Sequence, residues 1–170
     1  MAFRRQPGDQ LVASAAQRDE ASFAALVAAY QPDLLRVCYV ILGDSTLAED
    51  AAQSAWMKAW RKIDQLRDQD RVRSWLVAVA ANEARQLARR RRPTPRSMSE
   101  GLFGPDADPR LTDLNLALAR LTADERRLLA LRYVAEQTSE EIGAAIGASA
   151  GAVRHRLMRL LARLRAELDR

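Results

Sequence analysis

The stretch from Thr138 to Leu168, TSEEIGAAIGASAGAVRHRLMRLLARLRAEL, decides the fold class of this chain. Its spacing predicts a short helix, a turn that contains Gly147, and a longer helix rich in arginine. Thr138 and Glu141 stand three positions apart, which predicts a capping box for the first helix, and Ser149 is a suitable N-cap for the second. Two helices joined in this way are typical of a helix-turn-helix unit.

The second of these helices has one apolar face and one basic face. At about 100° per residue, five apolar side chains fall on one side: Val153, Leu157, Leu160, Leu164 and Leu168. The opposite side and its flanks carry Gly151, Arg154, His155, Arg156, Met158 and Arg159. A basic helix of this layout can enter a DNA major groove. A helical hairpin with a solvated basic face is the alternative interpretation.

The composition favours an all-α protein. The 170 residues are dominated by alanine, leucine and arginine, with only seven glycines, and suffice for one domain or two small ones. No run of 18 apolar residues is present, and the N-terminus, MAFRRQPGDQ, lacks the apolar core of a signal peptide. We therefore expect a cytoplasmic protein that inserts no segment of its own into a membrane.

Positive charge is concentrated in two places. The net charge is +5, but six arginines and no acid lie between Arg85 and Arg96, and five more lie between Arg154 and Arg165. Two basic patches predict two contacts with a polyanion. The chain has one cysteine, Cys38, and one histidine, so we expect no disulfide, no metal site of the usual Cys/His type, no cofactor and no enzymatic activity.

The N-terminal part predicts three helices before residue 64. Residues 9–18 form a short helical pattern, and residues 20–43 form a longer one in which Pro32 should kink or split the helix and Gly43 should end it. Cys38 lies in that apolar helix, where we expect a buried core residue.

The third predicted helix, residues 45–63, carries a polar stripe with an exposed methionine. Helical phase places Trp56 and Trp60 in the core. Off that face, at spacings of three and four, lie Asp50, Gln53, Met57 and Arg61. A methionine within such a stripe is either there by chance or marks the middle of a protein-binding surface.

After a turn-like stretch at 64–70, residues 71–91 predict one long helix with Val72, Leu76, Val79, Ala80 and Leu87 toward the core. Its other side alternates small residues with donors: Arg71, Ser74, Ala78, Asn82, Arg85 and Arg89. Such a face lets a phosphate backbone approach closely while the donors reach it. An amphipathic surface helix without a ligand is the alternative. The role of Trp75 stays open.

Residues 93–112, with several prolines and glycines, predict a flexible linker between two helical domains, 9–92 and 113–170. About 20 extended residues span roughly 65 Å, so the domains could reach well-separated DNA sites. The second domain should begin with a helix at 113–120 and another at 122–135, where Thr122 and Glu125 form a capping box.

Several short motifs occur in an order and spacing that resembles one family. They are LGD at 42–44, AEDAAQ at 48–53, AWRKI at 59–63, SWL at 74–76, Asn82, EEIG at 140–143 and GAVRHRLMR at 151–159. Over roughly residues 20–168, the chain resembles an extracytoplasmic-function (group 4) sigma-70-family RNA polymerase sigma factor. The resemblance implies two helical domains, called region 2 and region 4, joined by a linker.

The resemblance also implies roles for the residues singled out above. Core polymerase, through its β′ clamp helices, would be bound by Asp50, Gln53, Met57 and Arg61. The −10 promoter element would be bound by Arg71, Ser74, Asn82, Arg85 and Arg89. The −35 element would be bound by Arg132, Ser149, Arg154, His155, Arg156, Met158 and Arg159. Further implied partners are the polymerase β flap and an anti-sigma factor.

Some positions depart from the family pattern. Ser54 stands where an acid is usual, Ala152 and His155 alter the recognition helix, and Glu136 and Gln137 replace a glycine and an apolar residue. The −35 sequence therefore cannot be deduced. A stand-alone helix-turn-helix transcriptional regulator is the alternative function, and a helical protein-interaction adaptor is a third, although it leaves both arginine patches unused.

Overall fold

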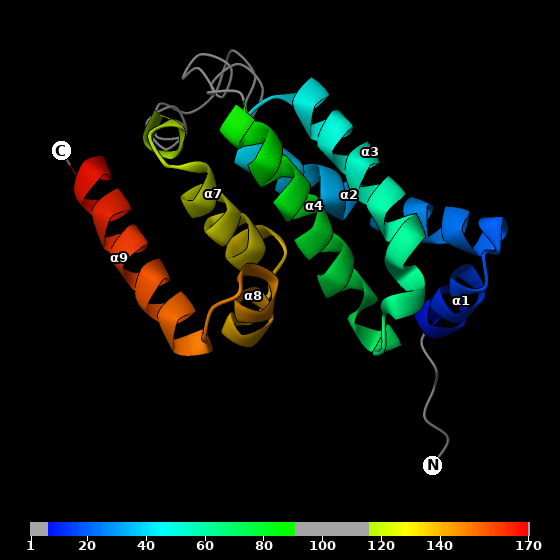
Figure 1. The fold of residues 1–170 in the computed structure, drawn as a ribbon. Helices are drawn as coiled ribbons and strands as arrows, with labels where there is room; N and C mark the ends of the chain where they lie inside the picture. Colours follow the sequence, from blue (N-terminus) through cyan, green and yellow to red (C-terminus); the bar gives the residue numbers. More distant parts are fainter. Residues whose placement is uncertain (1–6, 91–115, 170) are drawn as a thin grey trace.

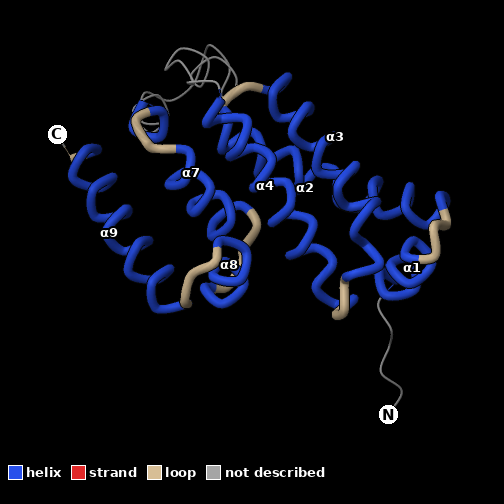
Figure 2. Tube along the Cα trace, viewed as in Figure 1, coloured by secondary structure: helices blue, strands red, loops and turns tan. Residues whose placement is uncertain are grey.

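The computed structural model describes residues 7–90 and 116–169, here called the first half and the second half. Throughout these residues the chain is helical, without a strand, as the sequence predicts (Figures 1 and 2). The predicted linker, 93–112, and the start of the predicted helix 113–120 lie outside the described residues; residues 116–119 are helical.

The first half packs four helices around one core. They are α1 (Pro7–Ala16), α2 (Glu20–Leu42), α3 (Ser45–Lys62) and α4 (Val72–Arg90), with short 3-10 turns at Ile63–Gln65 (η1) and Gln69–Arg71 (η2). Residue Asp19 caps α2 by accepting a hydrogen bond from the Ser22 amide at 2.8 Å. Gly43 ends α2 with φ +70°, as predicted, because a left-handed residue there costs glycine little.

Helix α2 is not split at Pro32. It continues through the proline because apolar residues on both sides, Leu26 before it and Leu34 and Val37 after it, are buried in the same core. By length and composition alone α2 could cross a membrane. That indication is weak, since six of its residues are buried against the rest of the protein.

Cys38 lies at the centre of this core and is fully buried, as predicted. Burial raises the pKa of its thiol to about 12. Trp56 is also buried, and its indole N–H donates to Gln31 Oε1 at 2.5 Å. The same prediction for Trp60 is wrong: it is only half-buried, at the edge of the core beside Phe23.

The second half forms the helix-turn-helix that the sequence predicts. Its elements are α7 (Ala123–Leu129), a π-helical turn η3 (Ala130–Val134), α8 (Ser139–Ile146) and α9 (Ala150–Leu168). Both capping boxes are present, at Thr122 with Glu125 and at Thr138 with Glu141, and Ser149 caps α9. The sequence missed the wider π turn that ends the predicted helix 122–135.

Two glycines shape the turn between α8 and α9. Gly147 ends α8 with φ +71°. A Cβ atom at Gly143 would lie 2.5 Å from the Ala148 carbonyl oxygen, so only glycine lets the turn pack this closely. On α9, four of the five predicted apolar residues are buried, whereas Leu168 is 45% exposed because the helix ends there beyond its packing partners.

The two halves pack together, an arrangement that we call closed. Helix α7 and the η3 turn lie against α2 and α4, and α4 lies between α3 and α7 (Figure 1). Arg126 of α7 is 1% exposed. Its Nε donates to the Ile41 carbonyl at the end of α2 at 2.6 Å, and its guanidinium also donates to the Leu121 carbonyl at 2.7 Å. The buried guanidinium of Arg126, in the second half, thus donates to a carbonyl group at the C-terminal end of α2, in the first half.

Candidate functional site

The predicted protein-binding stripe on α3 is open to solvent. Its four side chains, Asp50, Gln53, Met57 and Arg61, are all exposed, and Met57 is 59% exposed. Asp44 fixes the start of the helix by accepting from the Leu47 amide at 2.9 Å, while alanines bury the opposite face. Beside Met57, an apolar groove of about 520 Å³ runs between α2 and α3, lined by Phe23 and Trp60 among others.

The predicted −10 face of α4 is partly covered by the second half. Ser74 Oγ donates to Glu141 Oε1 at 2.6 Å, and Arg85 forms an ion pair with Asp124. Arg71 and Arg89 remain exposed, and Asn82 is half-buried. The structure therefore brings two of the five predicted residues into contact with α7 and α8, and leaves the other three outside those contacts.

These contacts keep the two carboxylates ionised. The hydrogen bond from Ser74 lowers the pKa of Glu141, and the backbone bond at Thr138 lowers it further. The hydrogen bond from Arg85 lowers the pKa of Asp124. Asp124 and Glu141 are thus each held in the charged form by a predicted DNA-binding residue of the first half.

The segment between η3 and α8 provides further contacts. Gln137 is 2% exposed, and its amide donates to the Ser74 carbonyl at 2.9 Å, which explains a polar residue where the family has an apolar one. Arg73 joins Asp33 and the Ala135 carbonyl, each at 2.8 Å. Glu136 has φ +57°, a conformation that favours glycine, the residue usual in the family here.

The predicted −35 residues divide into two sets. Five are exposed on α9: Arg154, His155, Arg156, Met158 and Arg159. The other two support the fold in the structure. Arg132 donates to the Gln137 carbonyl at 2.9 Å, and Ser149 Oγ accepts from the Ala152 amide at 3.1 Å.

Two arginines with tertiary roles, Arg126 and Arg127, were not singled out from the sequence. Both are buried, although they sit side by side in a short helix. The available signal was weak: two adjacent arginines followed at once by Leu128 and Leu129 cannot all face solvent on a helix that packs on both sides. Within the part of the chain that the structure describes, no group of acids, histidine and cysteine is suited to a metal ion.

The chain matches two protein-family models. Sigma-70 region 2 matches residues 26–94, and Sigma-70 region 4 matches residues 117–166. The extracytoplasmic-function RNA polymerase sigma factor SigC of Mycobacterium tuberculosis is 31% identical over 130 residues, which cover 71% of this chain and 69% of SigC. The probable sigma factor RfaY of Xanthomonas campestris pv. campestris is 30% identical over 161 residues, but the chain spans only 40% of its length.

Two solved structures resemble the described fold. CnrH, in complex with the cytosolic domain of CnrY, has a TM-score of 0.74 and 27% identity, and the match covers 96% of this chain and 98% of that one. The sigma factor RpoE of Bartonella quintana, in complex with the anti-sigma factor NepR, has a TM-score of 0.67 and 26% identity, with coverage of 86% and 96%. From these matches, the chain belongs to the sigma-70 family, as an RNA polymerase sigma factor of the extracytoplasmic-function type.

Proposed function

We propose that this protein binds core RNA polymerase and directs promoter-specific transcription initiation by recognising −10 and −35 elements. It acts in the cytoplasm, without a cofactor and without catalysing a reaction of its own. The observation that carries the proposal is the presence, in one chain, of an exposed α3 stripe and an exposed basic face on α9. One surface suits a protein and the other suits DNA.

The residue roles follow the resemblance. Asp50, Gln53, Met57 and Arg61 dock on the β′ clamp helices of polymerase, and the second half approaches the β flap. Arg154, His155, Arg156, Met158 and Arg159 enter the −35 major groove, where arginine can bind guanine through two hydrogen bonds and methionine offers only apolar contact. Arg132 and Ser149 reach the DNA backbone from the edges of that helix-turn-helix.

On the −10 side, Arg71, Ser74, Asn82, Arg85 and Arg89 contact the DNA strand. Ser74 and Arg85 can do so only after leaving Glu141 and Asp124, so promoter binding requires the second half to move away from α4. An anti-sigma factor is a further proposed partner. The support is that the closed fold resembles RpoE of Bartonella quintana, which was solved with such a partner.

Run-off transcription with purified core polymerase on genomic fragments tests the proposal. We expect specific transcripts that require this protein. A stand-alone regulator would instead bind duplex operator DNA without polymerase, and an adaptor would bind no specific DNA. Absence of both core binding and specific transcripts would contradict the proposal.

The −35 contacts are tested on the promoters found in that assay. Arg159→Ala should reduce initiation about tenfold where a −35 element is present, since a good base contact contributes roughly 1–3 kcal/mol of discrimination. Arg165→Ala is the matched control, because Arg165 lies on the same helix outside the predicted contacts. Equal effects of the two substitutions would remove Arg159 from the contact set.

A further inference from the structure

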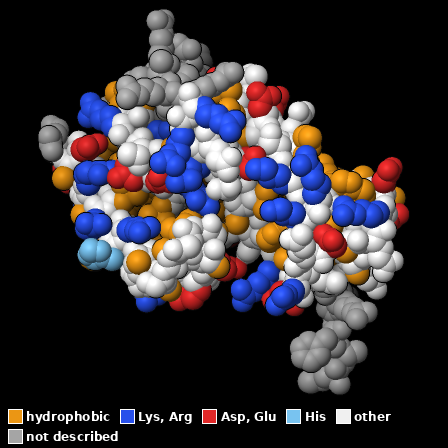
Figure 3. All heavy atoms as spheres, viewed as in Figure 1, with side chains coloured by type: hydrophobic (Ala, Val, Ile, Leu, Met, Phe, Trp, Pro, Cys, Tyr) orange, Lys and Arg blue, Asp and Glu red, His pale blue; other side chains and the backbone are white. Residues whose placement is uncertain are grey.

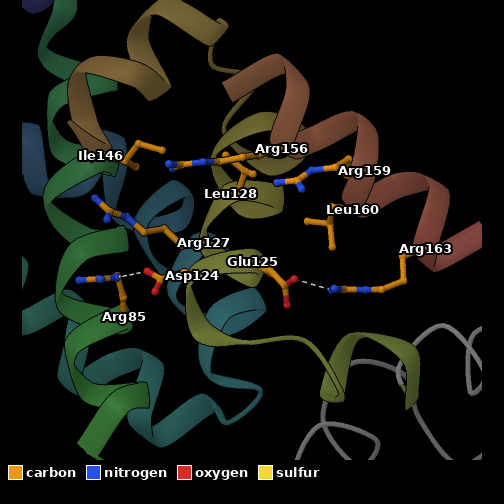
Figure 4. Close-up of a pocket in the computed structure, with 10 residues that line it drawn as sticks. All are labelled: Arg85, Asp124, Glu125, Arg127, Leu128, Ile146, Arg156, Arg159, Leu160 and Arg163. Carbon is orange, nitrogen blue, oxygen red and sulfur yellow. Dashed lines mark hydrogen bonds and ion pairs between the residues drawn. The ribbon is translucent and has the colours of Figure 1, made fainter. Parts of the chain in front are cut away.

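A cleft lined by arginines lies between α4, α7 and α9. Its volume is about 690 Å³, and five arginines and two carboxylates line it, so its lining carries three more positive than negative charges. Lys and Arg side chains stand on both sides of a hollow with hydrophobic side chains inside it (Figure 3). In the close-up, Arg156 and Arg159 extend from α9 across the cleft toward α7 (Figure 4). We call this the arginine cleft.

The two acids of the cleft each form an ion pair with an arginine. Asp124 pairs with Arg85, and Glu125 pairs with Arg163 at 2.5 Å (Figure 4). Arg156 and Arg159 form no ion pair with any residue of the described part of the chain. Two guanidinium groups therefore face the cleft without an ion-pair partner among the described residues.

Arg127, which is buried, lacks a hydrogen-bond partner for part of its guanidinium group. It is 7% exposed, and it donates one hydrogen bond, to the Ala145 carbonyl at 2.9 Å. Its Nε is buried without a partner. Burial lowers the pKa of Arg127, the charge of Arg85 lowers it further, and the nearby carboxylate of Asp124 acts in the opposite direction. A buried donor that lacks an acceptor is costly, and an anion in the cleft would supply that acceptor.

We propose that the arginine cleft binds a small oligophosphate, the chemistry shared by inorganic polyphosphate and the phosphate chain of a nucleotide. Arg127, Arg156 and Arg159 hold the phosphate oxygens, since planar guanidinium groups match phosphate geometry with paired hydrogen bonds. The volume lies within the range of small-molecule sites. Leu128, Ile146 and Leu160 add an apolar wall against which a base or ribose can pack.

The shape of the cleft favours a small anion over a macromolecule. The arginines converge on one cavity from three helices, whereas an acidic helix would need a long stripe of cations along its length. A DNA duplex is also a poor fit, because its backbone cannot reach a side chain as buried as Arg127. Duplex DNA can meet Arg156 and Arg159 only from outside the cleft.

Occupancy of the cleft would oppose promoter binding. Arg85 comes from the first half, and Arg127, Arg156 and Arg159 come from the second, so an anion among them attracts both halves and favours the closed arrangement. It also occupies arginines that the proposed function gives to DNA. The inference goes beyond the proposed function, and its test reads ligand binding rather than transcription.

The test is calorimetric titration of the full chain with three probes: sodium tripolyphosphate, ATP without magnesium, and an oligoglutamate peptide. We expect one tripolyphosphate per chain. The double variant R156Q/R159Q should bind it about tenfold or more weakly, given the strength of hydrogen bonds to charged groups. R154Q/R165Q is the matched control, because it removes the same charge from the same helix outside the cleft, and its affinity should change less than about twofold.

A second measurement needs no variant. In the wild-type protein, tripolyphosphate should selectively shift the NMR signal of the Arg127 Nε–Hε group. Tighter binding of ATP than of tripolyphosphate identifies a nucleotide as the ligand, and equal binding identifies the phosphate chain alone. Equal losses in both double variants, several phosphates per chain, an unshifted Arg127 signal, or binding of oligoglutamate without tripolyphosphate would each overturn the proposal.

Discussion

Helices α3 and α4 lie side by side in the same half, yet their candidate binding faces are in opposite states. The α3 stripe is exposed, and its four side chains make no contact that would have to be broken before a partner docks. The corresponding face of α4 is engaged by Glu141, Asp124 and Gln137 of the second half. The proposed polymerase-binding stripe is therefore accessible in the closed arrangement, whereas the proposed −10 face is in part occupied by the second half.

The difference follows from how each helix is buried. Helix α3 buries one face, mainly alanines, against α2 and α4. Helix α4 is packed from two sides, so Val77, Ala81 and Ala84 are buried together with Leu76 and Ala80. Small side chains that would let a phosphate backbone approach also let another helix approach. The same sequence pattern thus serves either a nucleic acid or a protein surface.

The largest expected effect comes from removing the buried cation that holds the second half in place. Arg126→Met leaves the Ile41 and Leu121 carbonyls without their donor, and we expect the free energy of unfolding to fall by roughly 2–4 kcal/mol. Chemical denaturation measures the loss, and hydrogen exchange should increase more in α7 than in α3. Arg120→Met, at an exposed position, is the control. Equal effects of the two variants would show that Arg126 does not join the halves.

An intermediate effect is expected at the open helix. The double variant Asp50→Ala, Gln53→Ala should weaken binding to core polymerase about tenfold, because a few central side chains carry most of an interface's energy. It should leave the contacts of α4 with the second half unchanged. Lys62→Ala, exposed on α3 but off the stripe, is the comparison variant. Fluorescence titration with core enzyme measures it, and unchanged affinity would remove the stripe from the polymerase interface.

The smallest effect concerns acid sensitivity at the covered helix. The pKa of Glu141 is below its ordinary value of 4.5 in the folded chain, so its contribution to stability is present above that value and is lost as pH falls through the folded pKa. Glu141→Gln should cost about 0.5–1 kcal/mol near pH 7, after allowance for solvent screening.

The cost of Glu141→Gln should shrink toward zero in acid, because the wild-type carboxylate is then protonated as well. Chemical denaturation between pH 7 and pH 3 measures the difference in the free energy of unfolding between the wild-type protein and the variant. Glu140→Gln is the neighbouring control, since among the described residues Glu140 pairs with the exposed Arg154, at 3.5 Å. A difference in unfolding free energy that does not depend on pH would mean that the charge of the Glu141 carboxylate does not hold Ser74 to the second half.

Local features were predictable from the sequence, and long-range ones were not. The capping boxes at Thr122 and Thr138 each need two residues three positions apart, so the local sequence is enough to predict them. The burial of Arg126 depends on the Ile41 carbonyl, 85 positions away, and nothing in the spacing of α7 indicates it. The covering of Ser74 and Arg85 was missed for the same reason, because it arises only when the two halves meet.

The core cysteine gives this chain a built-in reporter. Thiol reagents attack the thiolate, and Cys38 is both sealed from solvent and held protonated by its raised pKa. Labelling of Cys38 therefore requires the first half to open locally. The labelling rate then measures how often this opening occurs, without a probe attached to the protein beforehand. Since Cys38 is the only cysteine, the signal comes from one site. Local opening of the first half can thus be measured separately from separation of the two halves.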